Sequence, residues 1–362
     1  MVASEIFRGH VDSEPNSDFV EKKLSMTNKK DAHSLDGRSV MVTGATGSFG
    51  KKFIKNVLAN YEPERLIVFS RDELKQYDMA ADFPTSKYKC LRYFLGDVRD
   101  PQRLKMAFRG IDTVIHAAAL KQVPAAEYNP FECIRTNVIG AENIVNAALH
   151  TDVKNVLALS TDKAVNPTNL YGASKLAADK IFVAANNLSG AAGTRFSVVR
   201  YGNVIGSRGS VVELYHRLIA AGVTKLPVTD PRMTRFWISL DQGVEFVLSS
   251  LSRMSGGEIF VPKIPSMSVR ALASCIAPDL EQETIGIRPG EKLHEALITE
   301  DDARYTIELD DSYVIEPAFN WWEANDNLAT EGRRVREDFR YASDINTEWL
   351  DDVGMRRLIE MS

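Results

Sequence analysis

The sequence predicts an α/β protein built on a doubly wound, mainly parallel sheet. From residue 38 to about 206, short apolar runs rich in β-branched residues alternate with longer amphipathic segments. The apolar runs are continuous, which is typical of strands that helices cover on both faces. The first run leads directly into a glycine-rich turn. Crossovers between parallel strands are right-handed, so ligands of such a sheet bind at the carboxyl ends of its strands.

The order of the elements follows from the same alternation. Strands are expected at residues 39–44, 66–70, 90–97, 113–119, 155–161 and 196–202. Amphipathic helices are expected at residues 51–60, 72–82, 101–108 and, as the longest, 132–150. The alternation weakens after residue 206, where prolines and shorter strands predict a smaller lobe.

Composition argues against several classes of protein. Of the 362 residues, 44% are apolar and 26% are charged, which is the balance of an ordinary globular chain. The net charge of −5 provides no basic surface for nucleic acid or an anionic membrane. Three separated cysteines and six scattered histidines lack metal-ligand spacing, so we expect no metal. No run approaches the ~20 apolar residues of a membrane span, and an apolar signal core is missing, so we expect a cytoplasmic protein.

The glycine-rich turn predicts a dinucleotide site. It reads Thr43-Gly-Ala-Thr-Gly-Ser-Phe-Gly50. Gly44 permits a tight turn, Gly47 lets the backbone approach a pyrophosphate, and Gly50 allows a helix to pack closely on the strand. Free N–H groups at the helix start complete an anion site. The spacing is not the G-x-G-x-x-G of most dehydrogenases, and a turn without a ligand is the structural alternative. The predicted Rossmann-type site comprises Gly44, Thr46, Gly47, Ser48, Phe49 and Gly50.

The end of the second strand indicates which dinucleotide binds. Ser70 and Arg71 offer a hydroxyl and guanidinium donors suited to a 2′-phosphate, where an NAD-specific site usually has Asp or Glu. Asp72 follows directly and keeps NAD as the alternative to NADP. Further cofactor contacts are expected after the third and fourth strands, at Asp97, Val98 and Ala117.

These motifs divide the chain into parts with different expected roles. Residues 1–36 are expected to be a flexible extension with a short helix near 17–24. Residues 37–205 form the predicted NADP-binding domain, completed by about 234–255. Residues 206–233 and 256–335 form a smaller α/β lobe for the substrate, and residues 336–362 form a C-terminal tail.

The fifth strand and the helix after it carry the predicted reactive residues. The strand ends at Thr161, and the helix presents Tyr171 and Lys175 one turn apart on one face. The ammonium of Lys175 and an oxidised nicotinamide both favour the Tyr171 phenolate and lower its pKa from ~10. That phenolate accepts a hydroxyl proton while hydride passes to the cofactor. Tyr-x-x-x-Lys alone is a weak signal, but its distance from the Ser-Thr strand end makes it specific.

Taken together, these motifs resemble the extended short-chain dehydrogenase/reductases, and within them the soluble, inverting UDP-N-acetylglucosamine 4,6-dehydratases. The resemblance covers residues 38 to about 317. It rests on the segments TGATGSFG, FSRDELKQ, HAAALKQVPAAEYNP, STDKAVNPTNLYGASK, VRYGNVIGSRGSV, MTRFWISL, GGEIFVPKIPSM and IGIRPGEKLHE. The first 36 residues and the Trp-rich segment beyond residue 319 are less diagnostic.

Asp162 and Lys163 indicate the reaction class. Epimerases and simple reductases of this superfamily need only the Thr hydroxyl at the strand end and the Tyr-x-x-x-Lys pair. Dehydratases add an acid and a base directly after that Thr. An Asp-Lys pair at this position resembles the inverting enzymes. Two charged residues after a strand can also be a solvated turn without a function. Here, however, they follow a strand beside the helix of Tyr171, at the carboxyl edge of the sheet where ligands bind.

The resemblance implies a cycle with no net change in the cofactor. Tyr171 removes the proton of the 4-hydroxyl as hydride passes to the cofactor, and the new ketone acidifies carbon 5. Lys163 removes the carbon 5 hydrogen as a neutral amine, so burial and Lys175 are expected to lower its pKa from ~10.4. Protonated Asp162 donates to the departing 6-hydroxyl. Hydride returns to carbon 6 and a proton reaches carbon 5 from the opposite face, which inverts it.

The resemblance also implies the remaining ligands. In the membrane-anchored retaining relatives, Met is the expected residue at the position where this chain has Tyr171. The tyrosine therefore supports inversion of carbon 5. Arg235 suits either a phosphate or a buried structural pair. UDP-N-acetylglucosamine is the implied substrate and a homo-oligomer, with a hexamer as one form, the implied assembly. Expected substrate contacts are Lys121, Asn203, Thr229, Arg288 and Glu291, and further cofactor contacts are Arg135, Val204 and Arg208.

Two other functions remain open from the sequence. A nucleotide-sugar 4-epimerase would conserve the substrate mass, whereas a dehydratase removes one water. A non-catalytic NADP-sensing protein would be expected to have lost the Tyr-x-x-x-Lys pair, but both Tyr171 and Lys175 are present.

Overall fold

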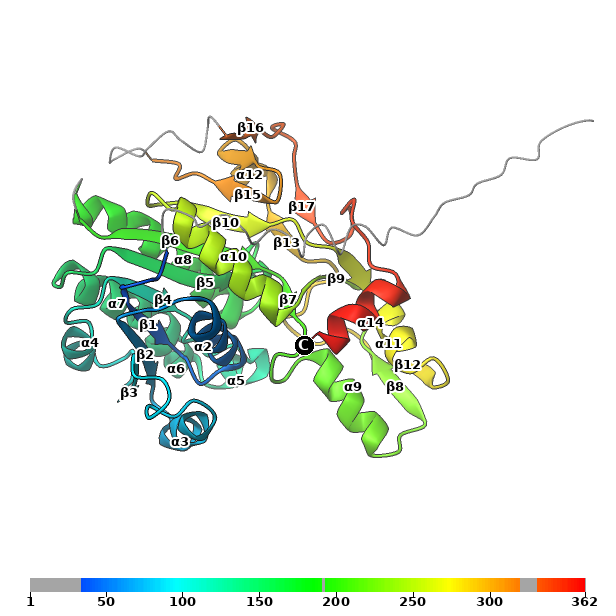
Figure 1. Cartoon of the computed structure of the whole chain (residues 1–362). Helices are drawn as coiled ribbons and strands as arrows, with labels where there is room; N and C mark the ends of the chain where they lie inside the picture. The colour runs from blue at the N-terminus through cyan, green and yellow to red at the C-terminus, as the bar shows by residue number, and fades with distance from the viewer. Residues whose placement is uncertain (1–33, 191–192, 320–330, 362) are drawn as a thin grey trace, which may run out of the picture. The chain divides into compact units, whose positions relative to one another are not determined.

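A computed structural model describes residues 34–190, 193–319 and 331–361 (Figure 1). The predicted N-terminal extension, including the helix expected near residues 17–24, lies outside the described residues except for its last positions. Within the described part of the chain, no helix has the length and apolar composition needed to cross a bilayer.

The main sheet confirms the predicted doubly wound fold. Seven of its strands are parallel, in the order β3-β2-β1-β4-β5-β6-β10. Three antiparallel strands, in the order β15-β14-β16, extend the sheet beyond β10. The parallel strands are β1 (Ser39–Thr43), β2 (Arg65–Ser70), β3 (Leu91–Leu95), β4 (Thr113–His116), β5 (Asn155–Thr161), β6 (Arg195–Tyr201) and β10 (Ile259–Pro262). The antiparallel strands are β14 (Thr306–Glu308), β15 (Ser312–Ile315) and β16 (Arg333–Arg334).

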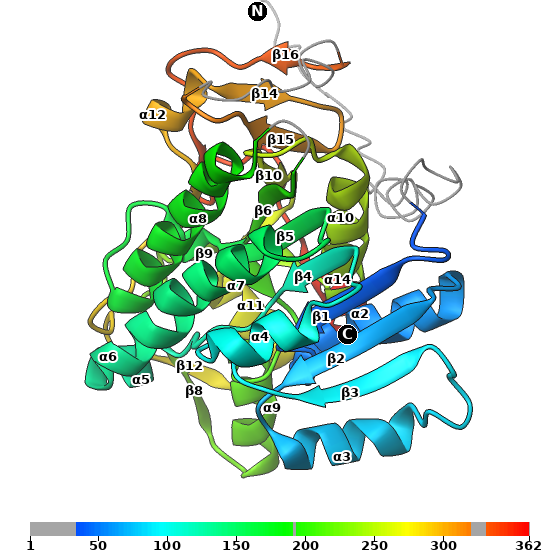
Figure 2. The ribbon, with the colours of Figure 1, turned by 90° about the vertical axis from the view of Figure 1, so that its left-hand side faces the viewer.

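Helices cover both faces of this sheet. Figure 2 shows α4, α7 and α8 on one side and α2 and α10 on the other. This arrangement buries β1 and β2 almost completely, which explains why their sequences are continuously apolar. The five helices named are α2 (Ser48–Asn60), α4 (Pro101–Ala107), α7 (Gly140–Leu149), α8 (Leu170–Ser189) and α10 (Leu240–Arg253). Two further helices of this part of the chain are α3 (Glu73–Asp82) and α5 (Val123–Tyr128).

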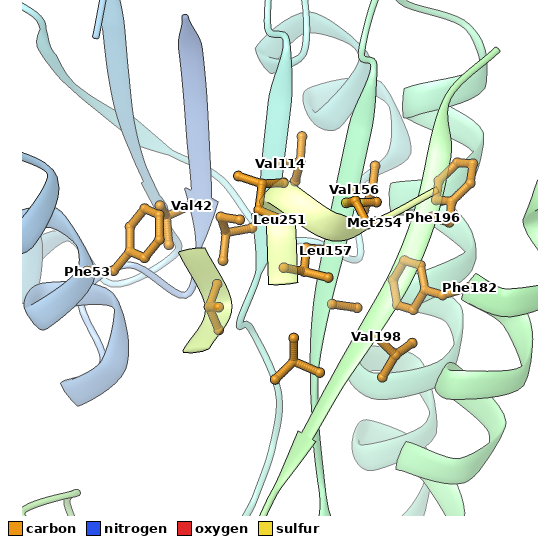
Figure 3. Close-up of a cluster of buried hydrophobic side chains, with 14 of the residues drawn as sticks. Val42, Phe53, Val114, Val156, Leu157, Phe182, Phe196, Val198, Leu251 and Met254 are labelled. Carbon is orange, nitrogen blue, oxygen red and sulfur yellow. The ribbon is translucent and has the colours of Figure 1, made fainter. Parts of the chain in front are cut away.

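The core lies between the sheet and these helices. Figure 3 shows valines of β1, β4, β5 and β6 packed with Phe53 of α2, Phe182 of α8 and Leu251 of α10. Each of these three side chains is no more than 2% exposed. Full burial of one such side chain contributes about 1.5–3 kcal/mol. Both layers of helices are therefore fixed to the sheet, and the carboxyl ends of the strands are held in place.

The helix predicted at residues 132–150 is interrupted. A short helix, α6 (Pro130–Ile134), is followed by a π-helical turn, η1 (Arg135–Ile139), and only then by α7. Asn137 lies in this turn, where its amide bonds the N–H and C=O of Leu120 and donates to Ser174 on α8. π-helical turns often occur at functional sites. Here the turn joins the chain after β4 to the helix that carries Tyr171.

A second, smaller core holds the lobe together. Apolar side chains of α9, α11 and α14 pack there with β8 and residues around β9. The helices of the lobe, α9 (Val211–Ala220), α11 (Val269–Ile276) and α14 (Asp352–Glu360), gather together in Figure 1. Helix α12 (Glu300–Ala303) lies apart from them, beside β15 of the main sheet. The strands of the lobe are β7 (Asn203–Val204), β8 (Lys225–Val228), β9 (Thr234–Ile238), β11 (Ser266–Ser268) and β12 (Glu281–Thr284). A further pair, β13 (Ala296–Ile298) and β17 (Tyr341–Ala342), places most of its buried apolar side chains in the main core.

The structure divides the chain differently from the predicted boundaries. Strands β10, β14, β15 and β16 belong to the main sheet, although residues 256–335 were assigned to the lobe. Of the unit predicted to complete the Rossmann domain, α10 packs on α2, but β9 pairs with β7 and β11 instead. The predicted tail packs on both parts of the chain, because Tyr341 of β17 belongs to the main core and α14 packs on α11. Pairing between distant segments decides these memberships, and local pattern does not reveal it.

Candidate active site

The glycine turn has the geometry of an anion site. Gly44 has a φ of +67°, a conformation that L side chains rarely adopt. A Cβ on Gly50 would lie 2.4 Å from the Cα of Ala45, so α2 packs against the turn only because this residue is glycine. Helix α2 begins after Gly47 without a side-chain cap. Its first N–H groups therefore remain available for a phosphate.

Polar side chains surround this turn at the ends of β2 and β3. The Thr46 hydroxyl lies 2.9 Å from that of Ser70. The Arg71 guanidinium lies 3.5 Å from the Asp97 carboxylate, which is also paired with Arg99 at 2.7 Å. These cations hold the pKa of Asp97 below its usual value although partial burial raises it. Arg71 therefore stands beside Ser70, half exposed and anchored by a carboxylate.

A loop of the lobe reaches the same helix start. The backbone N–H of Arg208 donates to the Ser48 hydroxyl at 3.1 Å, although the two residues are far apart in the sequence. The Arg208 charge also acts on the half-buried Asp72 carboxylate and helps to lower its pKa, after the larger effect of Lys75. The structure thus brings the predicted contact Arg208 to the glycine turn.

The other predicted cofactor residues have different environments. Ala117 donates from its N–H to the Thr43 carbonyl, beside Gly44. Val98 is 4% exposed and belongs to the core, where it lies against Gly140. Arg135 is exposed and is paired with Glu132 at 3.5 Å. The remaining two, Phe49 and Val204, are half-buried and pack against the main core.

These residues fit a nicotinamide dinucleotide. The uncapped start of α2 suits its pyrophosphate, and no side chain at Gly44 or Gly50 fits without displacing backbone. The ends of β1, β2 and β4 lie side by side in one sheet, so the contacts follow the carboxyl edge as such a cofactor requires.

The proposed acid and base are in direct contact. After β5 the chain forms a tight turn, η2 (Asp162–Ala164), which points both charged residues to the strand end. The Lys163 Nζ donates to Asp162 Oδ1 at 3.0 Å, and the Thr161 hydroxyl donates to the same oxygen at 2.9 Å. Asp162 is fully buried, and its Oδ2 has no hydrogen-bond partner among the described residues.

Helix α8 lies unusually close to this turn. Asn169 caps the helix, accepting the N–H of Gly172 at 2.8 Å. A Cβ on Gly172 would lie 2.1 Å from the Lys163 carbonyl oxygen. The glycine after Tyr171 therefore lets the helix approach Lys163, which the sequence motif alone did not indicate.

Tyr171 and Lys175 lie on α8 as predicted, but their electrostatics differ from the prediction. Burial raises the pKa of Tyr171 to about 12, which outweighs the opposing effects of Lys163 and the Thr161 hydroxyl. The protein groups alone therefore do not produce the lowered pKa, which was expected with an oxidised nicotinamide nearby. Lys175 donates to the Leu159 carbonyl at 2.7 Å, and burial lowers its own pKa despite the nearby Asp179.

The predicted charge states of the acid and base are also reversed. Burial alone would favour the neutral amine of Lys163, but Asp162 and Glu295 raise its pKa above the usual value. Burial alone would protonate Asp162, but Lys163 lowers its pKa. The expectations of a neutral Lys163 and a protonated Asp162 are wrong here. The Arg235 guanidinium opposes the positive charge of Lys163, whereas the sequence led us to expect this effect from Lys175.

Two residues of the lobe that the sequence analysis missed complete this charged group. The Glu295 carboxylate lies 3.7 Å from the Lys163 Nζ and 2.8 Å from the Lys292 Nζ. Lys292 also donates to the Val165 carbonyl at 2.8 Å. Both residues stand in the RPGEKLHE segment, whose density of charged residues was the only sequence signal for them.

The predicted substrate contacts are partly brought together. The Asn203 Oδ1 accepts from the Lys163 Nζ at 3.2 Å, and the charge of Lys163 contributes to a lowered pKa of Lys121, after the effect of desolvation. Arg288 and Glu291 are paired at 3.4 Å, and the carbonyl of Gly290 between them accepts from the Asn169 amide at 2.8 Å. The last predicted contact, Thr229, is buried directly after β8.

Arg235 resolves an alternative that the sequence left open. Its guanidinium donates to the carbonyls of Thr234, Leu293 and Lys292, and the side chain is 7% exposed. Arg235 therefore has a structural role, since it fixes the segment that carries Lys292 and Glu295.

This sheet order, the glycine turn after β1 and the pair on α8 define an enzyme of the extended short-chain dehydrogenase/reductase class. A family model described as polysaccharide biosynthesis protein matches residues 40–317, and the chain belongs to that family.

Individual relatives are more specific. The chain is 54% identical over 330 residues to a protein named UDP-N-acetylglucosamine 4,6-dehydratase (inverting) from Campylobacter jejuni subsp. jejuni serotype O:23/36 (strain 81-176), covering 90% of this chain and 98% of the relative. It is 41% identical to a UDP-glucose 4-epimerase from Rickettsia massiliae (strain Mtu5), covering 77% and 82%. The solved structure of Pen from Bacillus thuringiensis matches with a TM-score of 0.82 and 35% identity, covering 90% and 98%.

Proposed function

We propose that this chain is an NADP-dependent UDP-N-acetylglucosamine 4,6-dehydratase that inverts carbon 5. The product is UDP-2-acetamido-2,6-dideoxy-β-L-arabino-hex-4-ulose, and the enzyme is a hydro-lyase. The observation that carries the proposal is the contact of Asp162 with Lys163 at the end of β5, directly beside the helix that presents Tyr171. The 54% identity to a relative of that name supports the same substrate.

The first chemical task is to activate the 4-hydroxyl of the sugar. Tyr171 accepts the hydroxyl proton, and the Thr161 hydroxyl and the Lys163 charge favour its phenolate. The nicotinamide supplies an acceptor for the carbon 4 hydride and a donor of hydride to carbon 6. Lys175 donates to the Leu159 carbonyl, so its amine is held at the end of β5, where we expect it to contact the cofactor.

The second task, removal of water, needs a neutral Lys163 and a protonated Asp162. Transfer of one proton from the Lys163 Nζ to the Asp162 Oδ1 along their 3.0 Å hydrogen bond produces both forms at once. The pair holds one titratable proton before and after this transfer, so no exchange with solvent is needed. Lys163 then takes the carbon 5 hydrogen, and Asp162 donates its proton to the departing 6-hydroxyl.

Finer parts of the proposal concern ligands and assembly. The position of Arg71 beside Ser70 supports NADP over NAD, since a guanidinium suits a 2′-phosphate. The contacts of Asn203 and of the loop at Gly290 with the catalytic segment support substrate binding by Lys121, Asn203, Thr229, Arg288 and Glu291. A cytoplasmic homo-oligomer, with a hexamer as one form, remains part of the proposal.

Incubation with UDP-N-acetylglucosamine and NADP tests the function. Mass spectrometry should detect a product lighter by one water, and NMR should show inversion at carbon 5. The second candidate is a 4-epimerase, which the 41% identity to a UDP-glucose 4-epimerase favours. A product of unchanged mass would support the epimerase and exclude the dehydratase. Binding of NADP without any turnover would favour the sensing protein.

A further inference from the structure

Four buried or half-buried charges form one connected group at the boundary between the sheet and the lobe. Asp162 and Lys163 follow β5, whereas Lys292 and Glu295 precede β13. Consecutive side chains of the group, in the order Asp162, Lys163, Glu295 and Lys292, are 3.0, 3.7 and 2.8 Å apart. Two carboxylates and two amines balance, so the group is neutral overall, which is how buried charges are tolerated.

The backbone of Glu295 is fixed independently of these charges. Its N–H donates to the Ser343 hydroxyl at 3.0 Å, and its carbonyl accepts the N–H of Ser343 at 2.8 Å. The side chain is only 3% exposed. Glu295 therefore cannot follow Lys163 when that flexible side chain moves toward a substrate, so it acts as a fixed charge behind the amine.

We infer that Glu295 is a positioning residue of the dehydration: held by Lys292, it anchors the Lys163 amine and determines the pH at which that amine loses its proton to solvent. This inference rests on the proposed function. Glu295 stabilises the charged amine, so it opposes release of the Lys163 proton until the substrate is in place. Lys292 is paired with Glu295 and ties it to the Val165 carbonyl in the catalytic segment.

The other charged groups around Lys163 do not duplicate this role. Asp162 is the partner that receives its proton. Tyr171 on α8 has gained the proton of the 4-hydroxyl in the first step of the proposed cycle, so it is neutral when Lys163 acts. Arg235 on β9 and Lys121 after β4 are cations, and both oppose the charge on Lys163. Glu295 is thus the carboxylate of the lobe that favours the protonated amine.

Glu295→Gln tests the inference because it removes the charge and keeps the size. The readout is the rate of deuterium incorporation at carbon 5 from deuterated solvent, measured against pH by NMR. The proposed cycle needs the one proton that Lys163 and Asp162 share, so this rate falls at high pH, where the pair loses that proton to solvent. Without the nearby carboxylate the fall should begin about one pH unit lower or more, since a close opposite charge moves a pKa by about 1–3 units. Glu295→Asp keeps the charge and should leave the fall near its original pH.

A second readout and a matched control separate positioning from folding. Single-turnover reduction of the cofactor reports the carbon 4 step, which should continue in Glu295→Gln. Glu258 is equally buried but is bonded to Ser197 and to the N–H groups of Ser255 and Gly256, so Glu258→Gln should leave the pH profile unchanged. If Glu295→Gln does not fold, the double variant Glu295→Gln/Lys292→Gln is measured instead, because it leaves no unpaired buried charge. Its pH profile should move in the same direction, because Lys292 acts less on Lys163 than Glu295 does.

The outcomes distinguish this inference from the proposed function. If the unaltered enzyme forms no product lighter by water, the dehydration itself is wrong. If it does, but the profile of Glu295→Gln coincides with that of the unaltered enzyme, the positioning role is overturned. Equal losses in the carbon 4 and carbon 5 steps at an unchanged pH profile would also overturn it, since they indicate a purely structural residue.

Discussion

The amine of Lys163 lies 3.0 Å from the Asp162 carboxylate, so the two groups proposed to remove water are bonded to each other. Adjacent residues rarely place both side chains at one site in a regular strand, because successive side chains point to opposite faces. The tight turn η2 makes the contact here, directly after β5 ends. This local change of backbone conformation turns a strand end into an acid–base pair.

Replacement of Lys163 by Met should stop the dehydration after the first step. The variant keeps most of the side-chain volume but has no amine, so deuterium incorporation at carbon 5 should fall about 10²- to 10⁴-fold. Transient reduction of the cofactor should persist, because Tyr171 is unchanged. Lys180→Met, at an exposed position on the helix that carries Tyr171, is the control and should behave as the unaltered enzyme. Incorporation at the normal rate in Lys163→Met would remove Lys163 from its role as base.

The same pair should make folding stability depend on pH at both extremes. The pKa of Asp162 is lowered in the fold, so its contribution is present above the unfolded value of ~3.9 and is lost as pH falls through the folded value. The pKa of Lys163 is raised, so its contribution is present below ~10.4 and is lost as pH rises through the folded value. Urea unfolding should therefore show a plateau at intermediate pH with a decline on each side.

Asp162→Asn/Lys163→Met supplies the comparison for this pH dependence. Exchange of a buried ion pair for neutral residues is often neutral or stabilising by about 1–4 kcal/mol. The double variant should therefore remain folded at pH 7 and lose less stability than the unaltered protein toward either extreme. Identical pH profiles for the two proteins would show that the pair does not carry the dependence.

Addition of one methyl group at Gly172 should displace the catalytic turn. Its Cβ would meet the Lys163 carbonyl oxygen at 2.1 Å, and overpacking of this kind costs about 1–3 kcal/mol. Gly172→Ala should lower both the thermal midpoint and the dehydration rate. Gly243 is the matched control, since it is also helical and a Cβ there meets nothing within 4 Å. Gly243→Ala should be neutral or stabilising by up to about 1 kcal/mol, and equal behaviour of the two variants would refute the steric argument.

Removal of the Arg71 guanidinium should weaken NADP binding selectively. A hydrogen bond to a charged group contributes about 1.5–3 kcal/mol, so the Kd for NADP should rise about tenfold or more in Arg71→Ala. The Kd for NAD, which has no 2′-phosphate, should change little. Titration calorimetry with both cofactors measures this ratio, and Arg92→Ala on β3 controls for a general loss of positive charge. A parallel loss of affinity for both cofactors would contradict the assignment of the 2′-phosphate to Arg71.

Local patterns predicted the parallel half of the sheet well. The apolar runs at residues 39–44, 66–70 and 155–161 coincide with β1, β2 and β5 to within a residue. Burial between two layers of helices requires such runs, so the pattern reports it directly. The antiparallel strands β14 to β16 and the packing of α14 were not predictable in this way, because short strands and single helices do not indicate which distant segment they join.

The sequence by itself determined the residues that perform the proposed chemistry. Gly44, Asp162, Lys163, Tyr171 and Lys175 stand in motifs whose spacing has a local physical meaning: a turn, a strand end and one face of a helix. Tertiary structure alone decided their charges. Burial raises the pKa of Tyr171, and Asp162 together with Glu295, which its contacts with Ser343 hold in place, raises the pKa of Lys163. Charge states depend on every group within a few ångströms, and only the folded chain brings those groups together.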